Sequence, residues 1–324
     1  MANNVKLTIA IGDNSHVEAI KSGRIKPEGI DLEFINVVPQ IGAFRRMVRQ
    51  HEFDICELAP TTYLIARALG APFVALPIFL MRHFHHNGIL IRPDAGIEKP
   101  KDLEGKRMGV RAYSVTTGVW VRGLLQDEYD VDHSKITWVV DDEEHVEELV
   151  LPKNVEHVAE GRSLSDLMAS GNIQAGLAGN AGVGRAGSPS SGTWKQVEAN
   201  YPELFPNAHA LEIEWYNRTN IYPIHGTIVV KDKVLEEHPW VARSLFDAFM
   251  EAKREWLPKL HSGEANSAKD KKYREQALIV GEDPLPYGMA LNMPTIKALQ
   301  HTAHKQGLTP ELLPIERAFV DPEI

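Results

Sequence analysis

The chain has 324 residues, more than the roughly 250–300 at which a single hydrophobic core usually stops growing, so two lobes are expected. Hydrophobic residues make up 43% and charged residues 24%, as in ordinary globular proteins, which excludes a fibrous or disordered chain. The 35 basic and 44 acidic residues give a net charge of −9, which argues against nucleic acid as the main partner. A small anionic ligand would therefore need locally placed cations.

The N-terminal segment lacks the features of a secretory signal. Residues 1–20 show no basic region followed by a long apolar stretch. The chain also has no run of about 18 apolar residues that could span a bilayer. We therefore expect a cytoplasmic protein without a membrane partner. Cys56 is the single cysteine and lies in an apolar run, so we expect a buried, unreactive thiol and no internal disulfide.

The first ninety residues alternate between strand and helix patterns. Short apolar runs mark the strands, helical spacing marks the first helix, and Pro60 and Gly70 begin and end the second helix. The predicted elements are strands at 5–11, 30–37, 53–58 and 73–81 and helices at 41–49 and 60–70. This βαβ order favours a parallel sheet.

A second series of elements follows a connecting strand at 88–91. Its predicted members are short helices at 99–105 and 164–170, a longer helix at 115–128, and strands at 107–111, 136–140 and 173–178. A strand at 224–231 and a helix at 239–256 then return the chain to the first lobe. We expect residues 1–88 and 225–324 to form one lobe and residues 89–224 the other, with two crossing strands as a hinge and the ligand cleft between the lobes.

A cluster of cationic and imidazole side chains follows the strand at 73–81. It contains Arg82, His83, His85 and His86 and precedes the predicted crossing, where open α/β sheets place their ligands. Alternation along an extended segment would put His83 and His85 on one face and Arg82 and His86 on the other. A polar hinge that binds nothing is the alternative.

The same cluster could hold a metal ion. His-x-His spacing can bind zinc, but a catalytic zinc site usually needs a third His or carboxylate from elsewhere. Either Glu57 or His225 could supply that third ligand. Because the run lacks the His-x-x-x-His spacing of helical zinc sites, we expect no metal, and an essential divalent cation stays as the alternative.

The segment 109–118 predicts a strand that runs into a helix. The backbone N–H groups at a helix start attract anions, and Arg111 would add a bidentate clamp for a carboxylate. Ordinary N-capping by Ser114 is the alternative. A matching helix start at Thr61 and Thr62 would suit a second carboxylate.

Three further segments complete the pattern. Aromatic residues at 215–222 precede His225, which could line the cleft or be a satisfied core histidine. The acidic run at 141–148 indicates a solvated surface, and the Gly- and Ser-rich stretch at 184–192 indicates a loop. The chain has no Walker loop, dinucleotide fingerprint or G-x-S-x-G elbow, so neither a nucleotide site nor hydrolase chemistry is indicated.

Several segments resemble a known family. They are FDICELAPTTYLIARALGAPFVALPIFLMRHFHHNGI, DLEGKRMGVRAYSVTTGVWVRGLLQDEYDVD, LFPNA, RTNIYPIHGTIVVKD and HPWVARSLFDAF. Together they span residues 53–249 and resemble the 4,5-dihydroxyphthalate decarboxylase family, whose members look like the substrate-binding proteins of transporters. The resemblance implies an α/β fold of the periplasmic-binding-protein type 2, with two Rossmann-like lobes joined by a two-strand hinge.

The resemblance also implies that no organic cofactor is needed, and it points to a set of residues without assigning their roles. These residues are Arg82, His83, His85, His86, Arg111, Tyr113, Thr116, Thr117, Arg218 and His225. From the chemistry of the substrate we expect Arg111 and the helix start at 114–117 to bind a carboxylate, His85 or His86 to deliver a proton, and His225 or Glu57 to act on the phenol.

The functional hypothesis is decarboxylation of a small aromatic dicarboxylate, most simply 4,5-dihydroxyphthalate, by a homo-oligomeric enzyme. A binding protein that closes on an anionic aromatic ligand without turnover is one alternative. A metal-dependent lyase that uses the histidine cluster is the other. The missing export signal and the imidazoles expected in the cleft favour the enzyme, because a transport receptor must leave the cytoplasm and needs no titrating groups.

Overall fold

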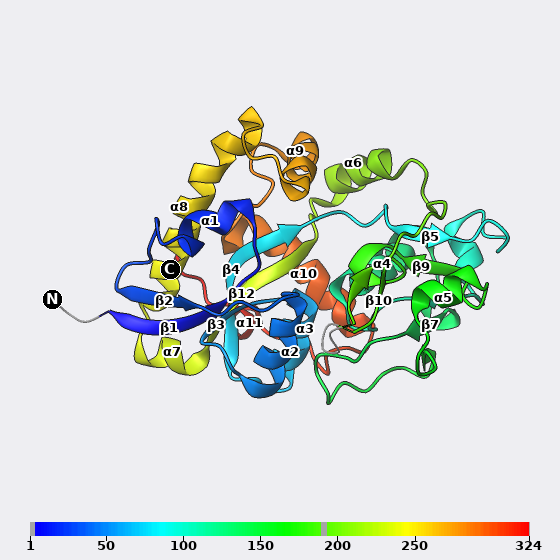
Figure 1. Ribbon diagram of the computed structural model, residues 1–324, viewed down its shortest axis with the longest axis horizontal. Helices are drawn as coiled ribbons and strands as arrows, with labels where there is room; N and C mark the ends of the chain where they lie inside the picture. Colours follow the sequence, from blue (N-terminus) through cyan, green and yellow to red (C-terminus); the bar gives the residue numbers. More distant parts are fainter. Residues whose placement is uncertain (1–3, 189–192, 324) are drawn as a thin grey trace. The chain divides into compact units, whose positions relative to one another are not determined.

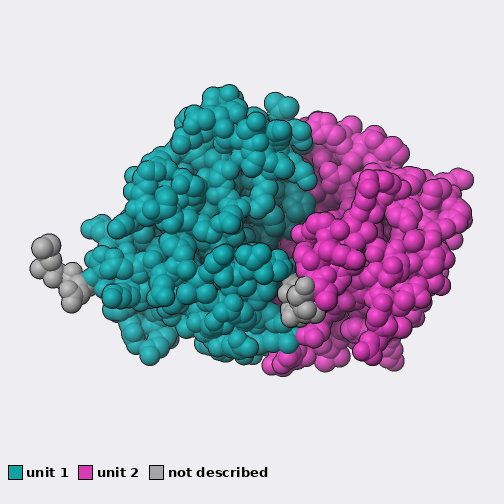
Figure 2. Space-filling view, in the orientation of Figure 1, with its two compact units in different colours: residues 1–83, 220–298, 311–324 teal, residues 84–219, 299–310 magenta. Residues whose placement is uncertain are grey.

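The computed structural model describes residues 4–188 and 193–323 and divides the chain into two compact units (Figure 2). The first unit comprises residues 1–83, 220–298 and 311–324, and the second comprises 84–219 and 299–310. The expected boundaries after 88 and 224 each lie five residues beyond the observed ones, after 83 and 219. Residues 299–310, expected in the first lobe, belong to the second unit, so the chain passes between the units four times and not twice. The ligand cleft between the lobes stays a prediction.

A five-stranded sheet with the order β2-β1-β3-β12-β4 forms the centre of the first unit (Figure 1). Its strands are β1 (Val5–Ala10), β2 (Ile30–Phe34), β3 (Ile55–Leu58), β4 (Phe73–Arg82) and β12 (Ile224–Lys231). Strand β1 pairs in parallel with β2 and β3, whereas β12 lies antiparallel between β3 and β4. The sheet is therefore mixed and not parallel as expected, because β12 enters it from the chain's excursion through the second unit and not from a crossover helix.

Helices bury the apolar faces of this sheet. They are α1 (Glu18–Lys21), α2 (Ile41–Gln50), α3 (Pro60–Ala68), α7 (Asp232–Glu237), α8 (Val241–Ser262), α9 (Ala268–Val280) and α11 (Ile315–Ala318). Helix α8 contributes Leu245 and Phe249 to a buried cluster that also contains Ile9, Leu76 and Ile228 from the strands. This core fixes the strand ends from which several candidate residues project.

The second unit has its own five-stranded sheet, in the order β5-β9-β6-β7-β8. Its strands are β5 (Ile89–Ile91), β6 (Arg107–Gly109), β7 (Thr137–Val140), β8 (Val155–His157) and β9 (Ala175–Leu177). All neighbours pair in parallel except β5, which is antiparallel to β9. The helices of this unit are α4 (Thr116–Tyr129), α5 (Leu164–Ala169) and α6 (Ala208–Thr219), and α10 (Met289–Lys305) continues into it from the first unit.

Part of the stretch expected to be a loop forms a short strand. The stretch at 184–192 was expected to be a loop, but its residues Arg185–Ala186 form β10, which pairs antiparallel with β11 (Lys195–Gln196). The part of that stretch at 189–192 lies outside the described residues.

Among the helices of the described residues, none combines the length and apolar character needed to cross a membrane.

Candidate functional site

Two histidines meet at the end of the first sheet. Strand β4 ends at Arg82, immediately before His83, and β12 begins at Ile224, immediately before His225. Because the two strands are antiparallel and Ile224 lies opposite Arg82, the sheet brings together residues far apart in the sequence. Their imidazole rings stack with centroids 3.8 Å apart and planes 16° from parallel.

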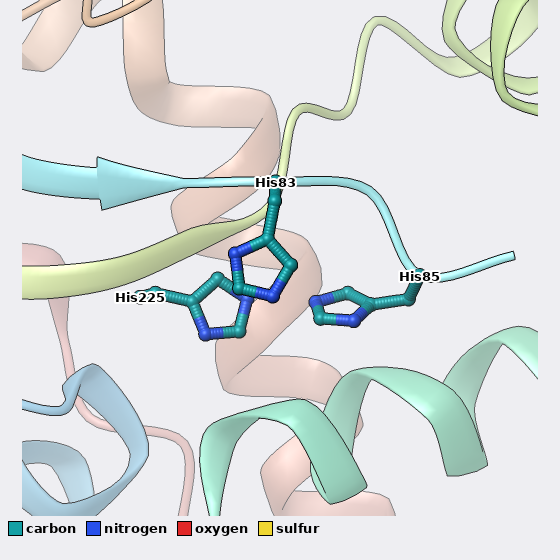
Figure 3. A group of neighbouring side chains, drawn as sticks. All are labelled: His83, His85 and His225. Atoms are coloured by element: carbon teal, nitrogen blue, oxygen red, sulfur yellow. The ribbon is translucent and has the colours of Figure 1, made fainter. Parts of the chain in front are cut away.

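A third imidazole, that of His85, points toward this stacked pair (Figure 3). One ring nitrogen of each histidine lies within 4.8 Å of the corresponding nitrogens of the other two. His85 and His225 are buried, at 4% and 5% exposure, and His83 is partly buried. The expectation that His83 and His85 share a face is confirmed, and the group formed by His83, His85 and His225 is named the imidazole triad below.

Desolvation controls the charge of the triad's first member. The surrounding protein lowers the pKa of His83 to about 4, and the positive charge of Lys272 lowers it further in the same direction. The neutral form of the ring therefore prevails at neutral pH.

Glu57 lies on β3, which pairs with β12, the strand that carries His225. This residue of β3 is 5% exposed, and its Oε2 accepts a hydrogen bond from the backbone N–H of Gly12 at 2.9 Å. Burial raises the pKa of its carboxyl, and the Gly12 hydrogen bond only partly offsets this. Gly226, the residue after His225, makes room for the carboxyl, because a Cβ atom there would lie 2.7 Å from Glu57 Oε1.

The contacts of Arg82 are those of a residue that stabilises the fold. Its Nη1 donates to the carbonyl oxygen of Tyr222 at 2.8 Å, and its Nη2 donates to the Asn292 side chain and, at 3.3 Å, to the carbonyl oxygen of Pro286. The guanidinium carbon lies 5.1 Å from the ring centroids of both Phe79 and Tyr222. These contacts tie the end of β4 to distant parts of the first unit and account for the burial of this cation.

His86 lies apart from the triad. Its ring, 2% exposed, makes edge contacts with Tyr129, Phe205 and Trp215 of the second unit, at centroid distances of 6.4, 5.7 and 6.0 Å. Its Nδ1 atom has no hydrogen-bond partner among the described residues, and burial lowers its pKa to about 4. These surroundings are those of a core histidine, and its catalytic role stays a prediction.

The expected carboxylate clamp carries an internal partner. Arg111, 3% exposed, donates from Nη1 to Oδ2 of Asp142 at 2.9 Å, and the preceding Asp141 forms a second buried ion pair with Arg185. The acidic run at 141–148 was expected to be solvated, and for these two residues that is wrong. Each carboxylate can be buried because a guanidinium on a neighbouring segment pairs with it.

The segment just before α4 also binds a carboxylate of the chain itself. Glu144 accepts hydrogen bonds from the backbone N–H groups of Tyr113 at 2.6 Å and Ser114 at 3.1 Å, and from the Ser114 hydroxyl. Capping by Ser114 is the alternative reading of the sequence, but the N-cap of α4 is Val115, without a side-chain hydrogen bond. The segment thus binds the carboxylate of Glu144, and its binding of a substrate carboxylate stays a prediction.

The remaining candidates lie on first turns or on the surface. Thr61 and Thr62 are buried in the first turn of α3, at 0% and 2% exposure. Thr116 is buried and Thr117 half-buried in the first turn of α4. Arg218, whose side chain is 55% exposed, pairs with Glu128 on the surface of the second unit, which gives no support to its expected role in substrate binding.

Sequence reasoning missed two residues, Asp142 and Glu144, that occupy the predicted anion-binding groups. Both belong to the acidic run. A run of carboxylates looks the same whether it is solvated or paired with buried cations, so only the tertiary structure distinguishes the two cases.

Comparison with known proteins shows to which family this chain belongs. The model of the NMT1/THI5-like family matches residues 17–179. A Comamonas testosteroni protein named 4,5-dihydroxyphthalate decarboxylase is 33% identical over 319 residues, which cover 95% of this chain and 94% of that protein. The chain belongs to the 4,5-dihydroxyphthalate decarboxylase family. A Pseudomonas putida protein of the same name is 33% identical over 222 residues, covering 66% of this chain and 82% of that one.

The expected fold of this 4,5-dihydroxyphthalate decarboxylase family member is confirmed by a solved structure. The Candida albicans CA3427 gene product, described as showing the generic periplasmic binding protein structural fold, aligns with a TM-score of 0.55. The alignment covers 98% of this chain and 96% of that one at 15% sequence identity. At this identity the likeness concerns the fold alone.

Proposed function

We propose that this protein decarboxylates a small aromatic dicarboxylate, 4,5-dihydroxyphthalate, to protocatechuate and CO2 without an organic cofactor. The observation that carries the proposal is the 33% identity to the Comamonas testosteroni protein of that name, because the alignment runs through 319 residues and nearly the whole of both chains. The aligned region contains every candidate residue from Glu57 to His225.

The reaction makes definite demands on a site. In 4,5-dihydroxyphthalate each carboxylate lies para to a hydroxyl, so removing that hydroxyl proton pushes electron density onto the ring carbon that bears the carboxylate. That carbon takes up a proton, the bond to the carboxylate carbon breaks, and CO2 leaves while the ring recovers its aromaticity. The site must hold the other carboxylate, transfer protons and keep water away from the reacting carbon.

The side chains of the imidazole triad and of Glu57 suit these demands. The imidazole triad and Glu57 place groups of the type most used for proton transfer and for electrophilic assistance in largely buried surroundings. The backbone N–H groups just before α4 already bind one carboxylate, that of Glu144, and so offer a donor set of the kind a substrate carboxylate needs. Which imidazole delivers the proton, the cytoplasmic location and the homo-oligomer stay predictions.

The test is incubation of the purified protein with 4,5-dihydroxyphthalate, with protocatechuate followed by chromatography and CO2 by trapping. Phthalate, which lacks the hydroxyl groups, is the matched control and should not react. Turnover of 4,5-dihydroxyphthalate alone supports the proposal. Binding of the substrate without release of CO2 would replace the enzyme with a non-catalytic binding protein.

A further inference from the structure

We propose that His83, His85 and His225 form a binding site for one divalent transition-metal ion such as Zn²⁺. Three protein imidazoles around one ion are a common donor set of catalytic zinc sites. The three ring nitrogens already lie within 4.8 Å of one another. With zinc–nitrogen bonds of about 2.0–2.1 Å, a tetrahedral site needs these nitrogens about 3.4 Å apart, and the near-parallel rings of His83 and His225 must rotate out of their stack to point their nitrogens at one ion.

Strand pairing holds the backbone of two triad members, His83 and His225, in place. His83 and His225 directly adjoin the paired residues Arg82 and Ile224 of neighbouring strands. The register of β12 against β4 shifts three times between Ile224 and Ile228. Irregular pairing of this kind re-aims side chains next to functional sites, and here His225 lies stacked on His83 at 3.8 Å.

The chemical surroundings also suit a cation. His85 and His225 are buried, so a bound ion would be sheltered from bulk water. The carboxyl of Glu57 lies beside Gly226, the residue adjoining His225. Carboxylates around the ligands of a metal site commonly orient them and raise its affinity.

Three protein ligands leave coordination positions open for a substrate. The proposed substrate carries two adjacent hydroxyl groups, a pair that chelates divalent ions, and this part of the inference rests on the proposed function. Binding the hydroxyl oxygens would favour their deprotonated form, which is the form that directs electrons toward the para carboxylate. The proposal of metal binding itself needs no assumption about the reaction.

The experiment is equilibrium dialysis of the full-length, metal-stripped protein, prepared without a polyhistidine tag, against Co²⁺ or Zn²⁺. We expect one ion per chain and visible absorption bands from bound Co²⁺ that change when protocatechuate is added. His85→Gln and His225→Gln should each weaken binding by at least about 100-fold, beyond the ~10–100-fold that loss of an outer-shell partner costs. Circular dichroism and a thermal melt show whether each variant is folded.

Two matched control variants test whether metal binding is specific to the triad. His209→Gln removes an exposed histidine of α6, and His86→Gln removes a histidine adjacent to His85 that is not part of the triad. Both should bind Co²⁺ like the wild type. Wild-type protein that binds no stoichiometric ion, or a folded His85→Gln variant that binds it unchanged, would overturn the proposal. If the fully stripped protein still decarboxylates the substrate, the proposed function holds and the metal plays no part in it. If the protein binds the metal but does not decarboxylate the substrate, the metal site holds and the proposed function fails.

Discussion

The carboxylate of Glu144 accepts a hydrogen bond from the backbone N–H of Tyr113, with 2.6 Å between nitrogen and oxygen. The neighbouring N–H of Ser114 donates to the same carboxylate. The sequence predicts that this helix start binds a carboxylate of the substrate. A protein carboxylate on these donors would compete with that substrate, so the charge of Glu144 becomes a test of where the substrate binds.

Glu144→Gln should lower the KM for 4,5-dihydroxyphthalate by roughly two- to tenfold, the worth of ~0.5–1.5 kcal/mol for one hydrogen-bonding group. The amide keeps the size of the side chain but removes the competing negative charge. Steady-state kinetics at low salt measure the effect, and Glu144→Asp, which keeps the charge, is the control. An unchanged KM in both variants would place the substrate carboxylate elsewhere.

Arg111→Ala should destabilise the protein by about 3–5 kcal/mol, because it leaves the carboxylate of Asp142 buried without its cation. Urea unfolding measures the loss. The double variant Arg111→Met/Asp142→Leu should recover much of it, since it removes both charges. Arg218→Ala removes the exposed partner of Glu128 and should change stability by less than about 1 kcal/mol. A similarly small loss in Arg111→Ala would mean that the pair is not required for folding and that Arg111 is available to a ligand.

The strands and most helices could be predicted because their apolar periodicity is strong. The strand at 224–231 agrees at both ends with β12, and alternation correctly placed His83 and His85 on one face. Helix α6 was missed because the only buried residue it contributes is Glu212, so it shows no apolar stripe.

The partners within the site could not be predicted in the same way. The choice between Glu57 and His225 as companion to the histidine cluster was open in the sequence. It depends on the pairing of β12 with β4 and on the irregular register near Gly226, neither of which leaves a periodic signal. The pairing of Arg111 with Asp142 is likewise a contact between segments that sequence spacing does not connect.

Glu212 should make stability depend on pH. Desolvation raises the pKa of its buried carboxyl to about 7 from an ordinary value of 4.5, despite opposing hydrogen bonds from the backbone of His86 and Asn87, and nearby Glu203 adds to the rise. The folded state therefore binds the proton more tightly than the unfolded state. Its contribution is fully present below pH 4.5 and is lost as the pH rises through about 7, by on the order of 3 kcal/mol.

The measurement is the free energy of unfolding of the wild type and of Glu212→Gln between pH 4.5 and 8. The wild type should lose stability relative to the variant across this range, because glutamine keeps the neutral state at every pH. The difference isolates Glu212 from the other ionisable groups, which both proteins share. A difference that does not vary with pH would show that the carboxyl is ionised at its ordinary pKa.

Gly226→Ala should lower kcat by up to about 100-fold with a smaller effect on KM, because the new Cβ would lie 2.7 Å from Glu57 Oε1 and displace a group proposed to act on the substrate. Gly42→Ala is the control, since its Cβ would meet only Val37 at an ordinary 3.4 Å. If Gly226→Ala is folded and keeps the wild-type kcat, the position of the Glu57 carboxyl does not matter to the reaction.

His85→Asn and His86→Asn should separate two adjacent histidines by role. His85 belongs to the imidazole triad, so its loss should reduce kcat by roughly 10²–10⁴, the usual worth of a general acid, while the protein stays folded. His86 lies among Tyr129, Phe205 and Trp215, so its loss should cost stability, about 0.5–3 kcal/mol, and leave most of kcat. Kinetics and urea unfolding of both variants measure the two effects.

A chelator then distinguishes the ways in which His85 could act, because it would stop a metal-dependent wild type and leave an enzyme that uses a metal-free imidazole unaffected. The reverse pattern, with kcat lost in His86→Asn and kept in His85→Asn, would move the chemistry away from the end of β4 and into the aromatic surroundings of His86.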